Sequence, residues 1–279
     1  MWETVAGGDP LEALDRTART GLVRAAVNDD HAEIASWKWR EMHGLGAGAH
    51  VYRIWGEASV GRRTLPWSAV IKLFRLGSEG LQAASAAPNS WDYWKREWHA
   101  YQAPWLTELR HGLVAPRRLA AGEQPDVAAW IAMEDLTGLD RRPWSLDHFQ
   151  LVARHLGEFN GRFMVAAAIP DDPWLSSDWL REWTARMDPV GLLSAARDDQ
   201  LVQRIFSPAM THDLVRLAAD RETILEALAT LPQTLCHRDV FPRNAFLRHT
   251  KSGAQTVAID WAFCGPGPVG SLSPWSKRR

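Results

Sequence analysis

The sequence predicts an α+β protein in which a small lobe built on an antiparallel sheet precedes a mainly helical lobe. Residues 32–40 and 51–58 alternate apolar and polar positions on either side of a glycine-rich stretch, which is typical of a β-hairpin. Residues 67–75 and 126–138 contain short apolar runs that favour buried strands. From about residue 145 onward, apolar residues recur at helical spacing.

The N-terminal segment carries the signature of a helix start. Asp9 is suited to the N-cap, Pro10 to the first helical position and Glu12 to the position three after the cap. We therefore expect a helix over residues 9–27, with Gly21 as a potential interruption.

The remaining elements follow the same rules. We expect a loop at 61–66, a helix over 90–109, a helix starting near Ser145, a helix over 171–187 and a long helix over 207–231. Residues 244–260 predict two strands around a Lys-Ser-Gly turn. The buried stripe of the helix at 90–109 is predicted to contain Trp91, Trp94, Trp98 and Tyr101. We divide the chain into a helical segment (1–30), a sheet-rich lobe (31–137) and a helical lobe (138–279).

Composition narrows the function classes. The 279 residues carry a formal net charge of -1, which argues against a dedicated nucleic-acid binder. Two cysteines form no disulfide framework, no apolar run has the length of a membrane span, and no secretory signal is visible. We therefore expect a cytoplasmic protein of unknown oligomeric state. We assign the sixteen tryptophans mainly to packing.

The segment "HRDVFPRN" contains the main candidates for catalytic and metal-binding residues. Asp239 and Asn244 lie in a loop between two apolar elements, and Asp260 ends the strand that follows the next turn. Two carboxylates and one amide suit phosphoryl transfer, in which one Asp faces a hydroxyl and oxygen ligands hold Mg²⁺. The alternative is an ordinary polar loop followed by a strand-end carboxylate. We interpret His237 as a brace of this loop rather than a general base.

Several other residues are expected to have structural roles. Arg238 and Arg243 are interpreted as solvated loop charges, and contact with a phosphate or an acceptor is the alternative. Cys236 and Cys264 flank the two motifs and are expected to be small packing residues that lie near each other. Lys72 stands inside an apolar strand, where a lysine is costly unless it is paired or reaches the surface.

These motifs resemble the aminoglycoside phosphotransferase and choline kinase family, whose fold is protein-kinase-like and bilobal. "HRDVFPRN" matches the catalytic-loop pattern H-x-D-x-x-x-x-N, and "AIDW" is similar to the family's aspartate motif. "AVIKLF" with Lys72, "YWKREWHAY" with Glu97 and "MEDLTG" at 133–138 resemble the lysine strand, the glutamate helix and the interlobe hinge. The resemblance covers roughly residues 30–270.

The resemblance implies an ATP- and Mg²⁺-dependent kinase that phosphorylates a hydroxyl of an aminoglycoside, a sugar or amino sugar, or an amino alcohol. Asp239 would face the acceptor hydroxyl, and Asn244 and Asp260 would hold the metal. The residues expected to contact the nucleotide are Lys72, Glu97, Glu134, Leu136, Gly46 and Gly48. The glycine turn reads G-x-G-x-G, not the kinase pattern, so a plain hairpin turn is the alternative there.

The sequence departs from the family after its aspartate motif. Asp260 lies 19 residues before the last residue, whereas the family continues into further helices that close the helical lobe. We therefore expect an incomplete helical lobe, as in a truncated chain, and a naturally short variant is the alternative. The alternative function is therefore a nucleotide-binding remnant that lacks the acceptor side. A metal-dependent phosphoesterase that uses His237, Asp239 and Asp260 is a third hypothesis, although further metal ligands are not evident.

Overall fold

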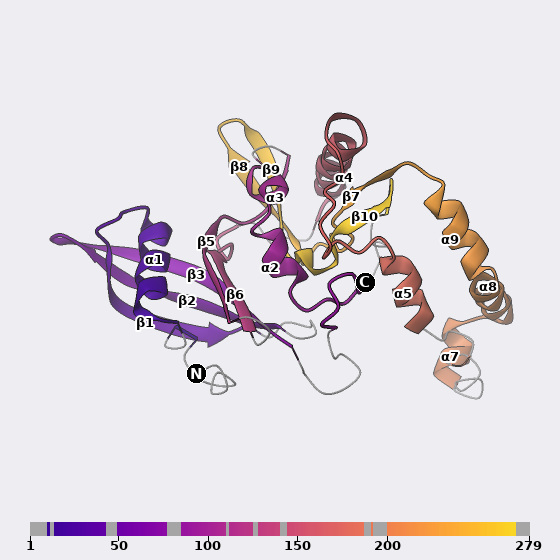
Figure 1. Cartoon of the computed structure of the whole chain (residues 1–279), viewed down its shortest axis with the longest axis horizontal. Coiled ribbons are helices and arrows are strands. Elements are labelled where there is room, and N and C mark those ends of the chain that lie inside the picture. The colour runs from indigo at the N-terminus through magenta and orange to yellow at the C-terminus, as the bar shows by residue number, and fades with distance from the viewer. Residues whose placement is uncertain are drawn as a thin grey trace.

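The computed structural model describes residues 10–11, 14–42, 49–76, 85–109, 112–124, 128–139, 144–186, 191 and 200–271. These residues form an elongated α+β molecule (Figure 1). A large sheet covered by a helix occupies one end, and the helices between residues 179 and 229 occupy the other. Two small sheets and a long helix lie between these ends.

The N-terminal lobe is built on a five-stranded antiparallel sheet with strand order β1-β2-β3-β6-β5. Its strands are β1 (Glu33–Glu41), β2 (Ala49–Val60), β3 (Arg63–Arg75), β5 (Arg118–Gln124) and β6 (Ala128–Glu134). The hairpin and both buried strands predicted from the sequence are therefore confirmed.

Two details of this sheet differ from the prediction. The expected loop at 61–66 is wrong, because β2 and β3 are joined by a two-residue turn and pair from Val60 and Arg63 onward. Gly61 adopts a positive φ of 59°, which tight hairpin turns require and glycine tolerates. Strand β5 was not predicted.

Helix α1 (Arg16–Val27) packs on this sheet and starts later than predicted. Its N-cap is Asp15, whose carboxylate accepts a hydrogen bond from the Ala18 backbone N–H at 2.8 Å. The expected N-cap, Asp9, lies outside the described residues. Gly21 does not interrupt the helix, and Leu22 and Val23 are fully buried against the sheet.

The segment at 90–109 is not one helix, so that prediction is wrong. It forms two short helices, α2 (Arg96–Ala100) and α3 (Pro104–Thr107), which are separated at Ala103. Trp91 precedes the helical part, and the residues that α2 buries are Arg96, Glu97 and Ala100. Proline at the first position of α3 explains the break, because proline has no backbone N–H with which to continue α2.

The helical lobe begins with α4 (Leu146–Gly161), whose predicted start is confirmed. The Ser145 hydroxyl accepts a hydrogen bond from the His148 backbone N–H, and the His148 ring accepts one from the Ser145 N–H. A π-helical turn, η2 (Arg162–Ala166), continues α4. The further helices are α5 (Trp179–Arg186), α7 (Gln200–Ile205), α8 (Pro208–Ala219) and α9 (Arg221–Ala229).

Two helix predictions in this lobe are corrected. The helix expected over 171–187 is confined to α5, since residues 171–178 are not helical. The long helix expected over 207–231 is divided into α8 and α9 at Asp220. Asp220 has a ψ of 4°, which lies outside the helical region and ends α8.

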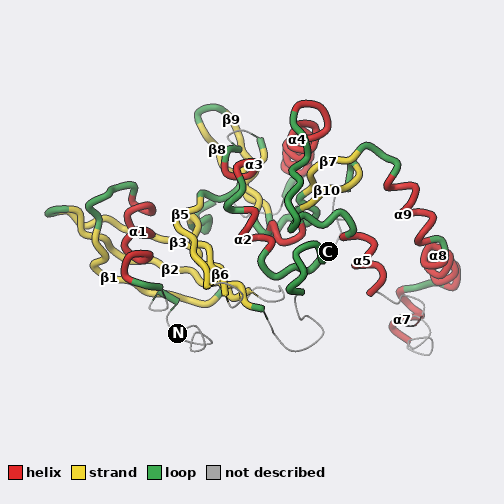
Figure 2. Tube along the Cα trace, viewed as in Figure 1, coloured by secondary structure: helices red, strands yellow, loops and turns green. Residues whose placement is uncertain are grey.

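Two small sheets carry the loops of interest (Figure 2). One pairs β7 (Gln233–Cys236) with β10 (Gly265–Pro268), which brings Cys236 beside Gly265 and next to the Cys264 position. The other has the order β4-β9-β8, with β4 (Leu113–Val114), β8 (Ala245–Thr250) and β9 (Gly253–Ala258). The two strands predicted around the Lys-Ser-Gly turn are therefore confirmed.

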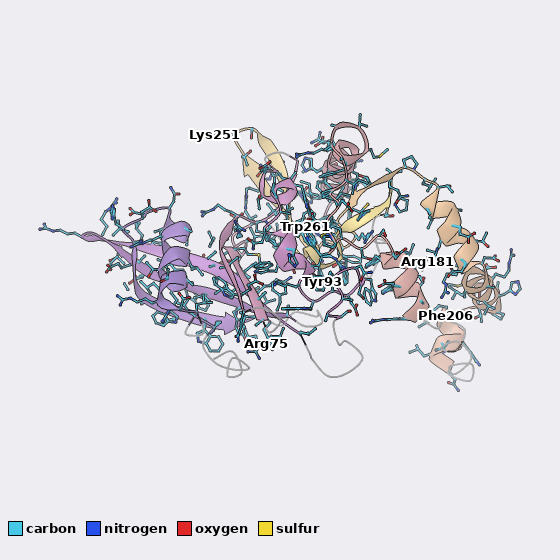
Figure 3. All side chains as sticks on the ribbon, in the orientation of Figure 1. Arg75, Tyr93, Arg181, Phe206, Lys251 and Trp261 are labelled. Carbon is cyan, nitrogen blue, oxygen red and sulfur yellow. The ribbon has the colours of Figure 1, made fainter. Side chains whose placement is uncertain are left out.

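The largest apolar core lies between the lobes and contains many of the aromatic residues. Trp261, completely buried, lies at the centre of the molecule (Figure 3) and contacts Trp105 and Phe159 edge-on. Within the described part of the chain, no helix combines the length and apolar character needed to cross a membrane. The division of the chain at residues 30/31 and 137/138 stays a prediction.

Candidate active site

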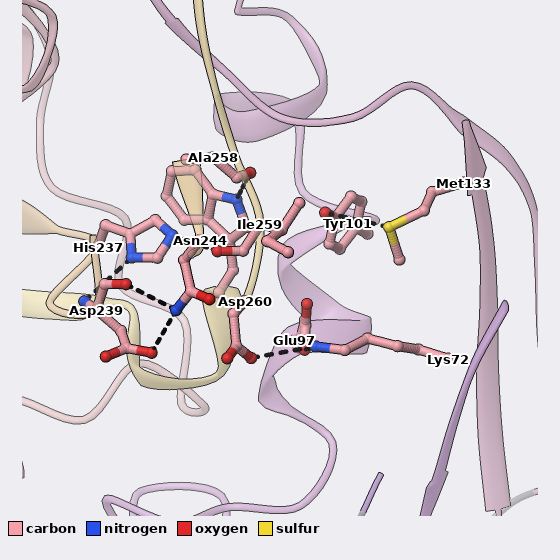
Figure 4. A network of polar contacts seen from close by, with 11 residues as sticks. Lys72, Glu97, Tyr101, Met133, His237, Asp239, Asn244, Ala258, Ile259 and Asp260 are labelled. Carbon is pink, nitrogen blue, oxygen red and sulfur yellow. Dashed lines mark hydrogen bonds and ion pairs between the residues drawn. The ribbon is translucent and has the colours of Figure 1, made fainter. Parts of the chain in front are cut away.

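Three residues from distant parts of the chain form an ion-pair cluster between the lobes (Figure 4). Lys72 on β3 donates from Nζ to Glu97 Oε2 at 2.5 Å and to Asp260 Oδ1 at 3.1 Å. Glu97 lies on α2, and Asp260 follows β9. The lysine predicted to need a partner thus has two, and both are residues that the sequence singled out.

Burial and pairing shift the pKa values within this cluster. Burial alone would lower the pKa of Lys72, but the Asp260 and Glu97 carboxylates raise it above its usual range. The nearby Lys72 ammonium lowers the pKa of Asp260. The Glu97 side chain is only 2% exposed, and this burial raises its pKa despite the opposing effect of Lys72. Glu97 is therefore the member that depends most on the ammonium for its charge.

A second polar group lies beside this cluster in the loop between β7 and β8. The Asn244 amide Nδ2 donates to the Asp239 backbone carbonyl at 3.0 Å and to Asp239 Oδ2 at 2.8 Å. Figure 4 shows Asn244 between Asp239 and Asp260. The five-residue spacing seen in the sequence therefore closes the loop on itself and fixes the Asp239 carboxylate.

The Asp239 carboxylate has an unusual protonation equilibrium. Burial is the main cause that raises the pKa of Asp239 to about 7, and the nearby Asp260 charge is the second. Arg243 and the hydrogen bond from Asn244 lower this pKa. A carboxyl group in this range can exchange a proton near neutral pH, as a general base requires.

His237 is fully engaged in supporting the loop. Its Nε2–H donates to the Ile259 carbonyl at 3.0 Å, and its Nδ1 accepts the Asp239 backbone N–H at 3.1 Å. Its ring packs on Trp261 at 4.3 Å, and burial lowers its pKa to about 4. With both ring nitrogens occupied, His237 has the geometry of a brace rather than a general base.

Two non-glycine residues of the site have left-handed backbone conformations. The φ angle is 69° at Arg238 and 68° at Asp260. Such conformations are uncommon outside glycine, and residues that keep them concentrate at functional sites because the surrounding contacts hold them in place.

Arginine contacts hold the segment that follows Asp260, and sequence reasoning missed them. Arg238 is only 6% exposed, so its interpretation as a solvated charge is wrong. Its guanidinium donates to the backbone carbonyls of Ser176, Phe263 and Pro266. Arg243, by contrast, is exposed as expected.

Arg96 performs the same task from the other lobe. It is 1% exposed and donates to the Ala262 carbonyl at 3.1 Å and to the Trp174 carbonyl at 2.7 Å. Arg96 adjoins Glu97 in the sequence, and Arg238 adjoins Asp239. Both arginines therefore tie a site residue to the turn after Asp260. The arginine pair has no sequence signal of its own, because its acceptors are backbone carbonyls.

An apolar cavity adjoins the ion-pair cluster. Lys72 and Glu97 border it, and its other walls include Val51, Val70, Met133, Leu136 and Phe246. The predicted hinge residues Glu134 and Leu136 both line this cavity, at the end of β6 and just beyond it. Gly46 and Gly48 lie outside the described residues, so their predicted role stays a prediction.

The donor set near Asn244 fits a hard divalent cation. Asn244 uses its amide nitrogen for Asp239, which leaves its amide oxygen as a ligand, and Asp260 uses only Oδ1 for Lys72. Among the described residues, no group of three or more His, Cys, Asp or Glu side chains could hold a metal ion. Two protein oxygen ligands supplemented by substrate phosphates are typical of Mg²⁺ sites.

The chain is similar to known proteins in sequence and in structure. A model of the phosphotransferase enzyme family (APH) matches residues 46–271. Two structures of aminoglycoside phosphotransferase APH(4)-Ia resemble the chain. The first has 13% sequence identity and a TM-score of 0.46, and the match covers 84% of this chain and 69% of that one. The second, a thermostable mutant, has 12% sequence identity and a TM-score of 0.44, and the match covers 88% of this chain and 72% of that one.

A more distant similarity is to the PknI kinase domain of Mycobacterium tuberculosis, with 16% identity and a TM-score of 0.27, covering 83% of this chain and 61% of that one. No curated protein sequence matches the chain significantly. The predicted α+β fold, an antiparallel-sheet lobe followed by a mainly helical lobe, is confirmed. The family match extends over most of the chain, from residue 46 to the end of the described residues. The chain therefore belongs to the phosphotransferase enzyme family.

Proposed function

We propose that this chain is an ATP- and Mg²⁺-dependent kinase that transfers the γ-phosphate to a hydroxyl group of a small molecule. The acceptor is an aminoglycoside, a sugar or amino sugar, or an amino alcohol. The observation that carries this proposal is the cluster of Lys72, Glu97 and Asp260 next to Asp239 and Asn244. Family membership supports the reaction class.

On the nucleotide side, the apolar cavity is proposed to take the adenine ring. Val51 and Val70 would cover one face of the ring, and the backbone of Glu134 and Leu136 would provide hydrogen bonds at its edge. Lys72 would contact the α- and β-phosphates, and Glu97 would hold its ammonium in place. Gly46 and Gly48 are proposed to approach the phosphates from the glycine turn.

On the acceptor side, Asp239 is proposed to orient the hydroxyl and to take its proton as the phosphoryl group is transferred. The Asn244 contact and the His237 brace hold the carboxylate in one orientation, which lowers the entropic cost of aligning the nucleophile. Asn244 and Asp260 would hold Mg²⁺, which neutralises phosphate charge when it is bound.

The reaction is tested by measuring ADP release from MgATP over a panel of acceptors that includes hygromycin B, kanamycin-type aminoglycosides, hexosamines and choline. Hygromycin B is included because it is bound in a structure of the similar APH(4)-Ia enzyme. We expect Asp239→Asn to reduce acceptor-dependent turnover by about 10²-fold or more, since general-base catalysis typically contributes that much.

The matched control is Asp213→Asn, because Asp213 is an exposed carboxylate on α8. It should keep full turnover with the responsive acceptor. Equal turnover in the Asp239 and Asp213 variants would refute the catalytic assignment. Binding of MgADP without transfer to any acceptor would instead support the nucleotide-binding remnant, and metal-dependent hydrolysis of p-nitrophenyl phosphate would support the phosphoesterase.

A further inference from the structure

A second and larger cavity lies on the N-terminal lobe, beside the hinge. Its volume is about 490 Å³, within the range of cavities that hold small organic ligands. It is bounded by β2, by the start of β3, by the end of α1 and by the hinge residues Glu134 and Asp135. Those two residues also border the apolar cavity beside Lys72, so the two cavities adjoin the same hinge. We call this second cavity the hinge groove.

The hinge groove carries positive charge that is only partly compensated. Arg53 and Arg117 both line it, as do two carboxylates. The Asp135 carboxylate is 3% exposed and already accepts Arg53 Nε at 2.7 Å. The Glu134 carboxylate accepts Arg248 Nη2 at 2.6 Å and the Arg117 backbone N–H at 2.8 Å. Both carboxylates are therefore engaged with partners of their own.

Guanidinium groups in the groove retain hydrogen-bonding capacity. Arg53 uses Nε for Asp135, and Arg117 uses Nη1 for the Ala25 carbonyl at the end of α1. Within the described part of the chain, Arg117 takes part in no ion pair, and its only acceptor for a side-chain hydrogen bond is that neutral carbonyl. An anion in the groove would find N–H donors of both arginines available, and planar guanidinium groups bind carboxylate and phosphate oxygens in pairs.

The groove also contains planar groups on which an aromatic ligand could stack. The indole ring of Trp55 borders it, and the Arg53 guanidinium lies 5.0 Å above this ring. Trp55 and Ser68 are paired across β2 and β3, so they point to the same face of the sheet. Indole and guanidinium planes both stack favourably on aromatic rings.

We propose that the hinge groove is a second ligand site, and that its ligand is a small flat anion, an aromatic ring system that carries a carboxylate or a phosphate. The anionic group binds the Arg117 guanidinium and the free nitrogens of Arg53, and the ring packs against Trp55. This assignment does not depend on phosphoryl transfer, because it rests on residues that lie outside the ion-pair cluster.

The test is calorimetric titration of the full chain with 2-naphthoate and 2-naphthyl phosphate, in the absence and in the presence of saturating ADP. The comparison of these two probes distinguishes a carboxylate ligand from a phosphate ligand. We expect saturable binding of at least one probe at one site per chain in both conditions. Neutral 2-naphthamide should bind at least tenfold more weakly, because it cannot form charge-assisted hydrogen bonds.

Variants locate the site. Arg117→Gln and Trp55→Ser should each weaken the anion about tenfold or more, while Arg62→Gln, an exposed arginine at the β2–β3 turn, should not. Thermal unfolding of each variant checks that it folds. The proposal is overturned if neither probe binds saturably, if ADP displaces the probe completely, or if folded Arg117→Gln binds it as tightly as the unaltered chain does.

Discussion

Substitution of Lys72 by methionine should destabilise the fold mainly through Glu97. The Glu97 side chain is 2% exposed, and its Oε2 accepts the Lys72 ammonium at 2.5 Å. Asp260 also loses a partner, but its side chain is 34% exposed and can be hydrated. Removing one partner of a buried pair costs about 3–5 kcal/mol, because the other charge is left without compensation. We expect a loss of unfolding free energy in this range at pH 8.

A second substitution identifies the source of that loss. Glu97→Gln in the Lys72→Met background removes the unpaired buried charge, so it should restore about 2 kcal/mol, the order of the penalty for a buried group left without its partner. In the unaltered chain, Glu97→Gln leaves Lys72 paired with Asp260 and should cost only about 1–2 kcal/mol. The four proteins form a double-mutant cycle that urea unfolding followed by circular dichroism can measure.

The pH dependence of Lys72→Met gives an independent check. Burial raises the folded-state pKa of Glu97, and loss of Lys72 raises it further because the lysine now lowers it. A carboxyl group with a raised folded-state pKa favours folding fully below its unfolded value of 4.5 and loses that contribution as pH rises through its folded value. The deficit should therefore be smaller near pH 4.5 than at pH 8. A loss below 1 kcal/mol at pH 8, or no rescue by Glu97→Gln, would refute this account.

Three further predictions concern buried or partly buried groups outside that pair. Arg238→Lys should destabilise the chain by about 2 kcal/mol or more in urea unfolding, because a compact ammonium cannot replace the planar guanidinium whose separate nitrogens reach three backbone carbonyls. An equal effect of Arg243→Lys at its exposed position would contradict this. Burial lowers the pKa of His99 to about 4, so the unfolded chain takes up the proton first as pH falls below 6.5. Between pH 6.5 and 4, His99→Phe should therefore lose about 1–2 kcal/mol less unfolding free energy than the unaltered chain. Parallel curves of unfolding free energy against pH for the two proteins would contradict the lowered pKa of His99. Burial raises the pKa of Cys236 to about 11 and of Cys264 to about 12, so a thiol reagent at pH 8 should label neither until urea unfolds the chain, as mass spectrometry would show.

Some errors of the secondary-structure prediction have a common cause. The helices expected over 90–109 and 207–231 contain suitable apolar spacing, yet each is divided in the structure. Apolar periodicity reports which positions a helix could bury, but a helix continues only where backbone geometry and neighbouring elements allow it. Pro104 marks one of the two breaks in the sequence, whereas Asp220 gives no comparable signal.

The arginine contacts could not be predicted for a different reason. Arg96 and Arg238 bind backbone carbonyls, and every residue has one, so no partner can be identified by residue type. A charged residue in a loop is most often solvated, which made the wrong interpretation of Arg238 the natural one. Only the packing of 174–176 against 262–266 reveals what these arginines bind.

The sequence by itself determined the chemical character of the site. A lysine in an apolar strand needs a partner. The H-x-D-x-x-x-x-N spacing places an amide within reach of its aspartate, and a carboxylate ends the following strand. Each of these is a local property that follows from residue type and spacing. Tertiary structure decided which groups meet. Lys72 and Asp260 are separated by 188 positions, yet Lys72 Nζ lies 3.1 Å from Asp260 Oδ1, because the sheet lobe and the segment 240–264 pack on a shared core around Trp261. Such long-range contacts depend on the burial of many apolar side chains at once, so they cannot be read from any short stretch of sequence.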